Sequence, residues 1–119
     1  MSSITESLSE LMTTDGALAV ALVDSGSGMM LGAQGGGIDI ESAAAGNTEL
    51  VRATLRTMKL TGLNEAIDDI LVTLGRQYHI IRPLTQNPEV FFYLVLDRAK
   101  ANLALARIKT KAADAGVQL

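Results

Sequence analysis

Hydrophobic residues follow helical spacing in some stretches of the chain and strand spacing in others, and the first stretch predicts a helix at 3–13. Ile4, Leu8 and Leu11 fall on one face at the helical repeat. Ser3 and Glu6 stand at the capping-box spacing, at which each side chain can accept from the other residue's backbone N–H. The chain therefore begins with an amphipathic helix that has a defined start.

A run of seven apolar residues, Ala17–Val23, follows this helix. The run is short and bounded by turn residues, which favours a strand buried on both faces. The segment 24–28 contains two glycines, which supply positive φ in a hairpin connection. Met29–Gln34 is then the returning strand, and three glycines at 35–37 form a joint.

The next pattern predicts a long helix at 39–60, with Asp39 as its N-cap. Its charged residues gather on one side, and the remaining arc spans roughly 200°, whereas a helix lying on one sheet needs only about 100°. Part of this arc needs a second cover. A neighbouring strand would then form an open sheet edge, which favours pairing with a second copy of the chain.

The last part of the chain predicts three strands and a helix. The strands are Ile67–Leu74, Gln77–Leu84 and Val90–Leu96. The helix is expected at 98–113 with Asp97 as its cap, and its inner face is expected to hold Ala101, Ala104, Leu105, Ile108 and Ala112. Arg107, Lys109 and Lys111 are expected near its C-terminus, where positive charge complements the helix dipole.

This order of elements, α-β-β-α-β-β-β-α, predicts an α+β fold: a five-stranded antiparallel sheet sandwiched by helices. The length of 119 residues suits a single domain over 1–119, with a core at about 4–113 and a short C-terminal tail. Hydrophobic residues make up 48% and charged residues 19%, which is typical of a globular protein.

Composition also limits the classes of function. The absence of Cys excludes disulfides, zinc-cysteine sites and thiol catalysis. The net charge of −3 and the aromatic content of 3% argue against nucleic acid as a partner. No apolar run reaches the roughly 18 residues of a membrane span, and the start lacks the features of a signal peptide. We expect a cytoplasmic protein that does not insert into a membrane.

Charge is unevenly distributed between the two parts of the chain. Residues 1–49 contain seven acidic residues and no basic one, whereas residues 50–119 contain ten basic and six acidic residues. The first part therefore carries −7 and the second +4. We expect the two parts to fold against each other, so that their charges partly cancel.

The sequence contains no recognisable metal or nucleotide motif. The single histidine, His79, has no Cys and no paired carboxylate beside it, so we expect it to be a surface or packing residue. No Gly-Lys pair is present for a Walker loop. The glycines at 26, 28 and 32 miss the dinucleotide-binding spacing and join two strands. We expect no cofactor and no metal.

Catalytic arrangements are equally absent from the pattern. Ser25 and Ser27 lie in a turn without the glycine-framed nucleophile elbow. Asp68 and Asp69 are adjacent, and adjacent strand residues point to opposite faces, so they cannot share a proton or a metal. We expect one of them in solvent and the other at an interface. An enzyme is therefore not expected.

Arg52, Arg56 and Lys59 form a basic stripe on the long helix. Two interpretations remain open: a solvated face, or a docking stripe for an acidic partner surface.

Three stretches of the sequence have a recognisable order and spacing. They are Asp15–Asp24 with the turn 25–28, the Ala/Gly-rich helix that ends in Leu60-Thr61-Gly62, and Ile70–Gly75 continuing through Tyr78–Leu84 and Leu94–Asp97 to Asn102–Arg107. Together they resemble the roadblock / dynein light chain family, over roughly residues 4–110. The resemblance implies a profilin- or longin-like sandwich and a homodimer, in which the second helices pack antiparallel and the third strands pair into one ten-stranded sheet.

The resemblance also implies a function. Proteins of this family serve as platforms or regulators for small Ras-like GTPases, and a short stand-alone chain is similar to the prokaryotic branch. We therefore expect a non-catalytic homodimeric scaffold or regulator that binds a small Ras-like GTPase and modulates its nucleotide cycle or recruitment. A heterodimer with a related chain is an alternative assembly.

The residues expected to serve this function lie on the long helix and the strand after it. The expected dimer interface consists of Ala44, Asn47, Val51, Thr54, Leu55, Met58, Asp69, Leu71 and Thr73, and the expected partner-docking residues are Arg52, Arg56 and Lys59. The alternative function is a small-ligand sensor or signalling-interaction module of PAS/longin-like shape. Against it, the inner residues offer few of the convergent polar groups that a ligand pocket needs.

Overall fold

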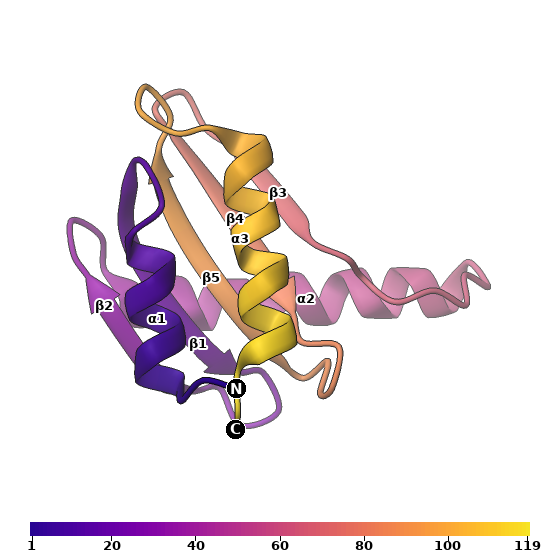
Figure 1. Ribbon diagram of the computed structural model, residues 1–119. Coiled ribbons are helices and arrows are strands. Elements are labelled where there is room, and N and C mark those ends of the chain that lie inside the picture. Colours follow the sequence, from indigo (N-terminus) through magenta and orange to yellow (C-terminus); the bar gives the residue numbers. More distant parts are fainter.

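The computed structural model describes residues 1–119 and arranges them in three layers, with a sheet between helices (Figure 1). In chain order the elements are α1 (Ile4–Met12), β1 (Ala17–Asp24), β2 (Met29–Gly35), α2 (Ile40–Leu60), β3 (Ile70–Thr73), β4 (Gln77–Pro83), β5 (Val90–Asp97) and α3 (Leu103–Gly116). This order confirms the predicted α+β fold. No helix combines the length and the apolar character that crossing a bilayer requires.

The sheet is antiparallel throughout, with the strand order β2-β1-β5-β4-β3. β1, β5 and β4 are therefore interior strands, and β2 and β3 are the two edges. α1 and α3 cover one face of the sheet, and α2 crosses the other (Figure 1). β1 has strands on both sides and side chains buried on both faces, as its apolar run predicts.

Two hydrophobic cores lie on opposite faces of the sheet, because successive strand residues point to opposite sides. On β5, Phe92 and Leu94 join the core under α1 and α3, whereas Phe91, Tyr93 and Val95 join the core under α2. The chain thus has enough apolar strand residues to support helices on both faces.

The predicted starts of the first two helices are confirmed. The Ser3 Oγ accepts from the Glu6 backbone N–H at 3.1 Å, and the Glu6 Oε1 accepts from the Ser3 N–H at 3.1 Å, which completes the capping box. Asp39 caps α2, since its Oδ1 accepts from the Ser42 backbone N–H at 3.2 Å.

The predicted strand Ile67–Leu74 is too long, because β3 begins only at Ile70 and ends at Thr73. Pro83 explains the late start. The Leu84 N–H donates to the Val90 carbonyl on β5. Because backbone groups point to alternate sides along a strand, those of Pro83 point toward β3. In the observed register Asp68 would lie opposite Pro83, and proline has no N–H to continue the ladder.

The prediction for the last helix is wrong in its start and in its inner face. α3 begins at Leu103, and Asn102 rather than Asp97 caps it, accepting from the Leu105 N–H at 3.1 Å. Asp97 instead caps a turn, since its Oδ1 accepts from the Ala99 N–H at 3.0 Å. The residues that α3 buries are Ala106, Thr110 and Asp114, and not Ala104, Leu105, Ile108 or Ala112.

Two smaller expectations about this region also fail. Ala101 packs against the core but lies before the helix. The last turn of α3 contains no basic residue, because the helix continues to Gly116. Arg107, Lys109 and Lys111 therefore lie in its middle.

Residues near the two ends of the chain lie side by side (Figure 1). Ser2 forms a parallel bridge with Val117. The Ser2 N–H donates to the Gly116 carbonyl at 2.7 Å, and the Gln118 N–H donates to the Ser2 carbonyl at 2.7 Å. The terminal segments therefore support each other at the edge of the α1 and α3 layer.

Candidate interaction surface

The C-terminal half of α2 extends beyond the sheet. The helix has 21 residues, which corresponds to roughly 32 Å. Its buried residues are Ala44, Thr48 and Val51, all in the first 12 positions of the helix. Figure 1 shows the later turns, and the connector that follows them, projecting past the strands as an arm. We call residues 52–66 the α2 arm.

The structure divides the predicted interface residues of α2 into two groups. Ala44 and Val51 are buried against the sheet of the same chain, so they offer no surface to a second molecule. Asn47, Thr54 and Met58 are half-buried, and Leu55 is exposed. The part of the predicted surface that remains accessible on α2 therefore lies mainly in the α2 arm.

Two exposed leucines of the α2 arm were missed by the sequence analysis. Leu60 is 82% exposed and Leu63 is 53% exposed. On the helical wheel Leu60 lies beside Glu49, at the border of the apolar arc, and Leu63 lies beyond the end of α2, so neither belongs to that arc. Only the projection of the arm beyond the sheet reveals them as surface residues.

The edge strand β3 directly follows the connector of the α2 arm, and it forms the edge of the sheet beside which the arm projects (Figure 1). Its Ile70 and Val72 exchange backbone hydrogen bonds with β4, because positions 79 and 81 face β3 in the observed register. The backbone N–H and C=O groups of Leu71 and Thr73 therefore point away from the sheet. Both of these residues are exposed, and Leu71 is 36% exposed.

The aspartate pair before β3 lies outside the strand and binds two arginines. The Asp68 side chain is 77% exposed and accepts from Arg82 Nη1 at 3.0 Å. The Asp69 side chain is buried, and both of its oxygens accept from Arg107, at 2.8 and 2.9 Å. These hydrogen bonds, followed by the charge of Asp69, raise the pKa of Arg107. Asp69, predicted for the dimer interface, is thus already engaged within its own chain.

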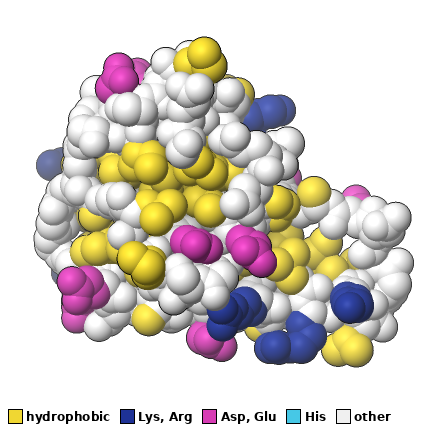
Figure 2. Space-filling view, turned by 90° about the horizontal axis from the view of Figure 1, so that it is seen from below, with side chains coloured by type: hydrophobic (Ala, Val, Ile, Leu, Met, Phe, Trp, Pro, Cys, Tyr) yellow, Lys and Arg dark blue, Asp and Glu magenta, His cyan; other side chains and the backbone are white.

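Only part of the basic stripe on α2 is free of contacts within the chain. Arg52 donates to the Ser25 carbonyl of the β1–β2 turn and pairs with Glu49 at 3.8 Å. Arg56 and Lys59 have no ion-pair partner. Figure 2 shows Lys and Arg side chains gathered along one border of the projecting arm, with hydrophobic side chains beside them. The arm therefore combines apolar and cationic surface.

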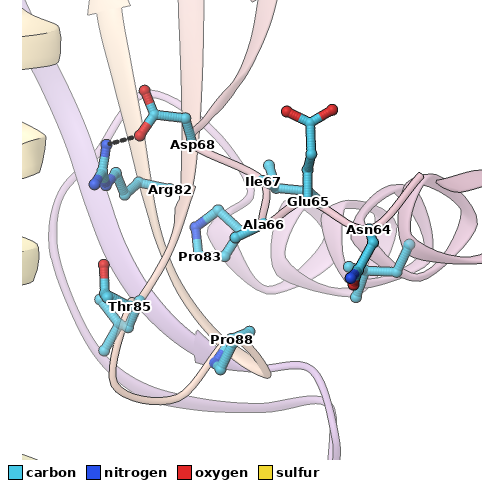
Figure 3. A pocket seen from close by; sticks show the side chains of 11 residues that line it. Asn64, Glu65, Ala66, Ile67, Asp68, Arg82, Pro83, Thr85 and Pro88 are labelled. Atoms are coloured by element: carbon cyan, nitrogen blue, oxygen red, sulfur yellow. Dashed lines mark hydrogen bonds and ion pairs between the residues drawn. The ribbon is translucent and has the colours of Figure 1, made fainter.

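A pocket of about 480 Å³ lies between Leu55 on α2, the connector and the 82–88 segment (Figure 3). Its charged side chains are Glu65, Asp68 and Arg82. Arg82 and Asp68 are paired across it, and the Glu65 carboxylate points away from Arg82 and Thr85 in Figure 3. The charged groups of the pocket thus do not converge on a ligand, which does not favour the ligand-sensor alternative.

His79 is a packing residue, as expected. Its ring meets the Tyr93 ring edge-on, with 5.4 Å between centroids. Its Nε2 lies 2.8 Å from Gln77 Oε1, and its Nδ1 lies 3.0 Å from the Tyr93 hydroxyl. Burial lowers the pKa of His79. No group of three or more His, Asp or Glu side chains is placed to hold a metal ion.

Comparison with known sequences finds no match among family models and none among curated proteins. Comparison with solved structures does find matches. MglB from Myxococcus xanthus is 23% identical, with a TM-score of 0.79 over 94% of this chain and 91% of its own. The Roadblock/LC7 domain from Streptomyces avermitilis is 14% identical, with a TM-score of 0.80 over 96% of this chain and 93% of its own.

A third solved structure, MglB with a tetrameric arrangement, is 22% identical, with a TM-score of 0.78 over 92% of this chain and 81% of its own. All three matches extend over nearly the whole of this chain. The fold implied by the sequence resemblance is thereby confirmed. The chain shares the fold of MglB and Roadblock/LC7 domain proteins.

Proposed function

We propose that this protein is a non-catalytic, homodimeric scaffold or regulator that binds a small Ras-like GTPase in the cytoplasm and modulates its nucleotide cycle or recruitment. The observation that carries the proposal is the α2 arm beside the open edge of β3, within a fold shared with MglB and Roadblock/LC7 domain proteins.

The dimer is proposed to form through α2 and β3. An open edge strand leaves backbone groups without partners, and pairing with an identical edge across a two-fold axis satisfies them. The outward backbone groups of Leu71 and Thr73 meet this requirement. The exposed apolar side chains of the arm, Leu55 and Leu60, supply area for the second α2 to cover.

The partner is proposed to dock on the cationic border of the arm. Arg56 and Lys59 are free of ion pairs, so they can attract an acidic surface without first breaking an internal contact. Docking of this kind orders mobile switch segments in a partner, and ordering such segments alters a nucleotide cycle. The sequence has no Gly-Lys pair, so in this proposal the GTPase alone carries the nucleotide.

The assembly is tested by light scattering at micromolar concentration. A homodimer has twice the chain mass of 12.5 kDa, and a measured mass near 12.5 kDa would overturn this part of the proposal. If a related chain from the same organism then restored the double mass on mixing, the heterodimeric alternative would replace it.

Partner binding is tested by capture of the small Ras-like GTPases of the source organism, each loaded with GDP or with a non-hydrolysable GTP analogue. We expect one nucleotide form to bind better than the other. The double variant Arg56→Glu/Lys59→Glu should weaken binding at least about tenfold. Arg76→Glu/Lys100→Glu makes the same change in net charge away from the arm and should have little effect. Failure of every GTPase in both forms would refute the proposal.

A further inference from the structure

Helix α3 directs polar side chains toward the core and hydrophobic side chains toward solvent. Thr110 and Asp114 are buried, together with Ala106. Ile108, in contrast, is 63% exposed and Leu105 is 43% exposed. A surface helix normally has the opposite arrangement.

The outward residues of α3 form a continuous apolar strip. At about 100° per residue, they occupy an arc of about 100° that contains no polar residue. We call this strip the α3 stripe; it consists of Ala104, Leu105, Ile108, Ala112 and Ala115, all exposed. It runs for three turns, roughly 17 Å. Single exposed leucines are common on protein surfaces, but a continuous strip marks a contact surface.

A buried network fixes the orientation of the helix. The Asp114 Oδ2 accepts from Arg82 Nε at 3.1 Å, from Arg82 Nη2 at 3.0 Å and from Thr85 Oγ1 at 2.8 Å. Its Oδ1 accepts from the Thr85 N–H at 2.8 Å. Rolling α3 to bury Ile108 would withdraw this carboxylate from all four donors. The hydrogen bonds of Asp114 therefore hold α3 in an orientation that leaves the α3 stripe exposed.

Positive charge borders the stripe on both sides. Lys111 lies beside Ala104 on the helical wheel, and Lys109 lies beyond Leu105 on the opposite border. Neither lysine has an ion-pair partner, although the Lys109 Nζ lies 3.1 Å from Thr13 Oγ1. The bordering cations thus remain available to carboxylates.

Hollows flank the helix on the same two sides. One, of about 360 Å³, lies between α3 and the 68–69 segment and is lined in part by Ile108 and Lys111. The carboxylates of Asp68 and Asp69 also line it, paired with Arg82 and Arg107. The other, of about 140 Å³, lies between α1 and α3, and its charged lining residues are Lys109 on α3 and Glu10 on α1. The side chains at the two borders of a partner helix lying along α3 can therefore enter these hollows.

We propose that the α3 stripe docks a helix of a partner protein that carries apolar side chains along one face and carboxylates along both borders of that face. The straight three-turn stripe matches the contact line of one helix on another, and its three alanines permit close approach of the two axes. The carboxylates would pair with Lys109 and Lys111.

Two other occupants fit the stripe less well. A lipid surface is bound through bulky aromatic and aliphatic side chains, and most of the stripe is alanine. A second copy of this chain offers α1, whose exposed face is polar (Thr5, Glu6, Ser9 and Glu10) and supplies no apolar strip. The copy's α2 arm carries Arg56 and Lys59, and the copy's own α3 stripe is bordered by Lys109 and Lys111. Either apolar surface would therefore bring cations against the lysines beside the stripe.

The stripe lies on the opposite face of the sheet from α2 (Figure 1). It therefore does not depend on the dimer or on the GTPase proposed above, and each proposal can fail without the other.

The test uses nuclear magnetic resonance titration of the 119-residue chain with a synthetic helical peptide. The probe carries Leu and Ala on one face and Glu on both borders of that face; a matched control peptide carries Lys in place of Glu. We expect amide shifts confined to α3 and the adjoining part of α1, with the Glu peptide bound at least about tenfold more tightly than the Lys peptide.

Two variants test the residues involved. Ile108→Glu should weaken Glu-peptide binding at least about tenfold, because it places a carboxylate in the centre of the stripe. Lys109→Glu/Lys111→Glu should reverse the preference between the two peptides. Both variants change exposed or half-buried residues, and an unchanged urea midpoint would show that each remains folded.

Several results would overturn the proposal. These are equal binding of the two peptides, absence of α3 shifts at millimolar peptide, or shifts confined to α2 and β3. Binding to vesicles of phosphatidylcholine with phosphatidylglycerol that shifts the same amides, without a response to peptide, would assign the stripe to lipid. A fall in the mass of the Ile108→Glu variant would assign it to a second copy.

Discussion

Arg82 on β4 and Asp114 on α3 form a buried ion pair, with 3.0 Å between Nη2 and Oδ2. Their side chains are 8% and 3% exposed. Thr85 supplies two further donors to the same carboxylate, so the charge of Asp114 is fully compensated. The pair joins the end of the sheet to the second half of α3.

Removing one member of this pair should destabilise the protein strongly. Arg82→Met leaves the Asp114 carboxylate buried without its cation, and we expect the free energy of unfolding to fall by about 3–5 kcal/mol. Asp68→Ala removes only the exposed partner of Arg82 and should lower it by less than about 1 kcal/mol. Urea unfolding curves with an unchanged slope provide the comparison. Equal losses in the two variants would contradict this interpretation.

The edge strand provides a test of dimer formation. Leu71→Asp places a charge where two β3 edges are proposed to meet, and an unpaired charge is costly to bury. We expect light scattering to show the mass of a single chain. Leu31→Asp is the matched control, because Leu31 is 40% exposed on the opposite edge strand, β2. Val51→Asp is unsuitable as a test of dimer formation. Val51 is buried within one chain, so this substitution would disturb folding instead.

His79 should make stability depend on pH. Burial lowers its pKa below the ordinary value of 6.5 in the folded chain. Between 6.5 and the lower folded pKa, the unfolded chain binds a proton that the folded chain does not. The free energy of unfolding should therefore fall as the pH drops below about 6.5, and less steeply in His79→Gln. Urea unfolding at a series of pH values measures both slopes, and identical slopes would refute the assignment.

Gly35 should tolerate no side chain. Its φ is +86°, and a Cβ there would overlap the Leu18 carbonyl oxygen of the neighbouring strand. We expect Gly35→Ala to lower the free energy of unfolding by at least about 2 kcal/mol. A Cβ at Gly36 meets no atom within 4 Å. Gly36→Ala should therefore change the free energy of unfolding by less than about 1 kcal/mol. Thermal unfolding of the two variants distinguishes them.

The start of α3 can be tested at its cap. Asn102→Ala removes the acceptor for the Leu105 N–H, and we expect a loss of about 1 kcal/mol in the free energy of unfolding. Asp97→Ala would be the more damaging substitution if the helix began at 98. Comparison of the two variants by circular dichroism melting decides between these starts.

Elements with one dominant local signal could be predicted from the sequence. The capping pair Ser3 and Glu6 defined the start of α1, and the run Ala17–Val23 defined a strand buried on both faces. The overwide arc of α2 indicated surplus apolar surface on that helix. The projection of its second half could not be predicted, because it depends on where α2 crosses the sheet.

Two of these errors, the start of β3 and the inner face of α3, have physical causes that local patterns do not contain. β3 starts late because the register of β4 places Pro83, which lacks an N–H, where the ladder would continue to Asp68. The inner face of α3 was predicted from its hydrophobic side chains, but the buried pair of Arg82 with Asp114 orients the helix the other way. A partner from a distant element overrides the local pattern in both cases.

The bridge between Ser2 and Val117 has a practical consequence for protein engineering. Because Ser2 and Val117 lie side by side, a short linker can join the two ends of this chain, and the ring can be reopened between Gly36 and Gly37, in the connection from β2 to α2. Such a circular permutant would keep every helix and strand, while placing new fusion points next to the beginning of α2.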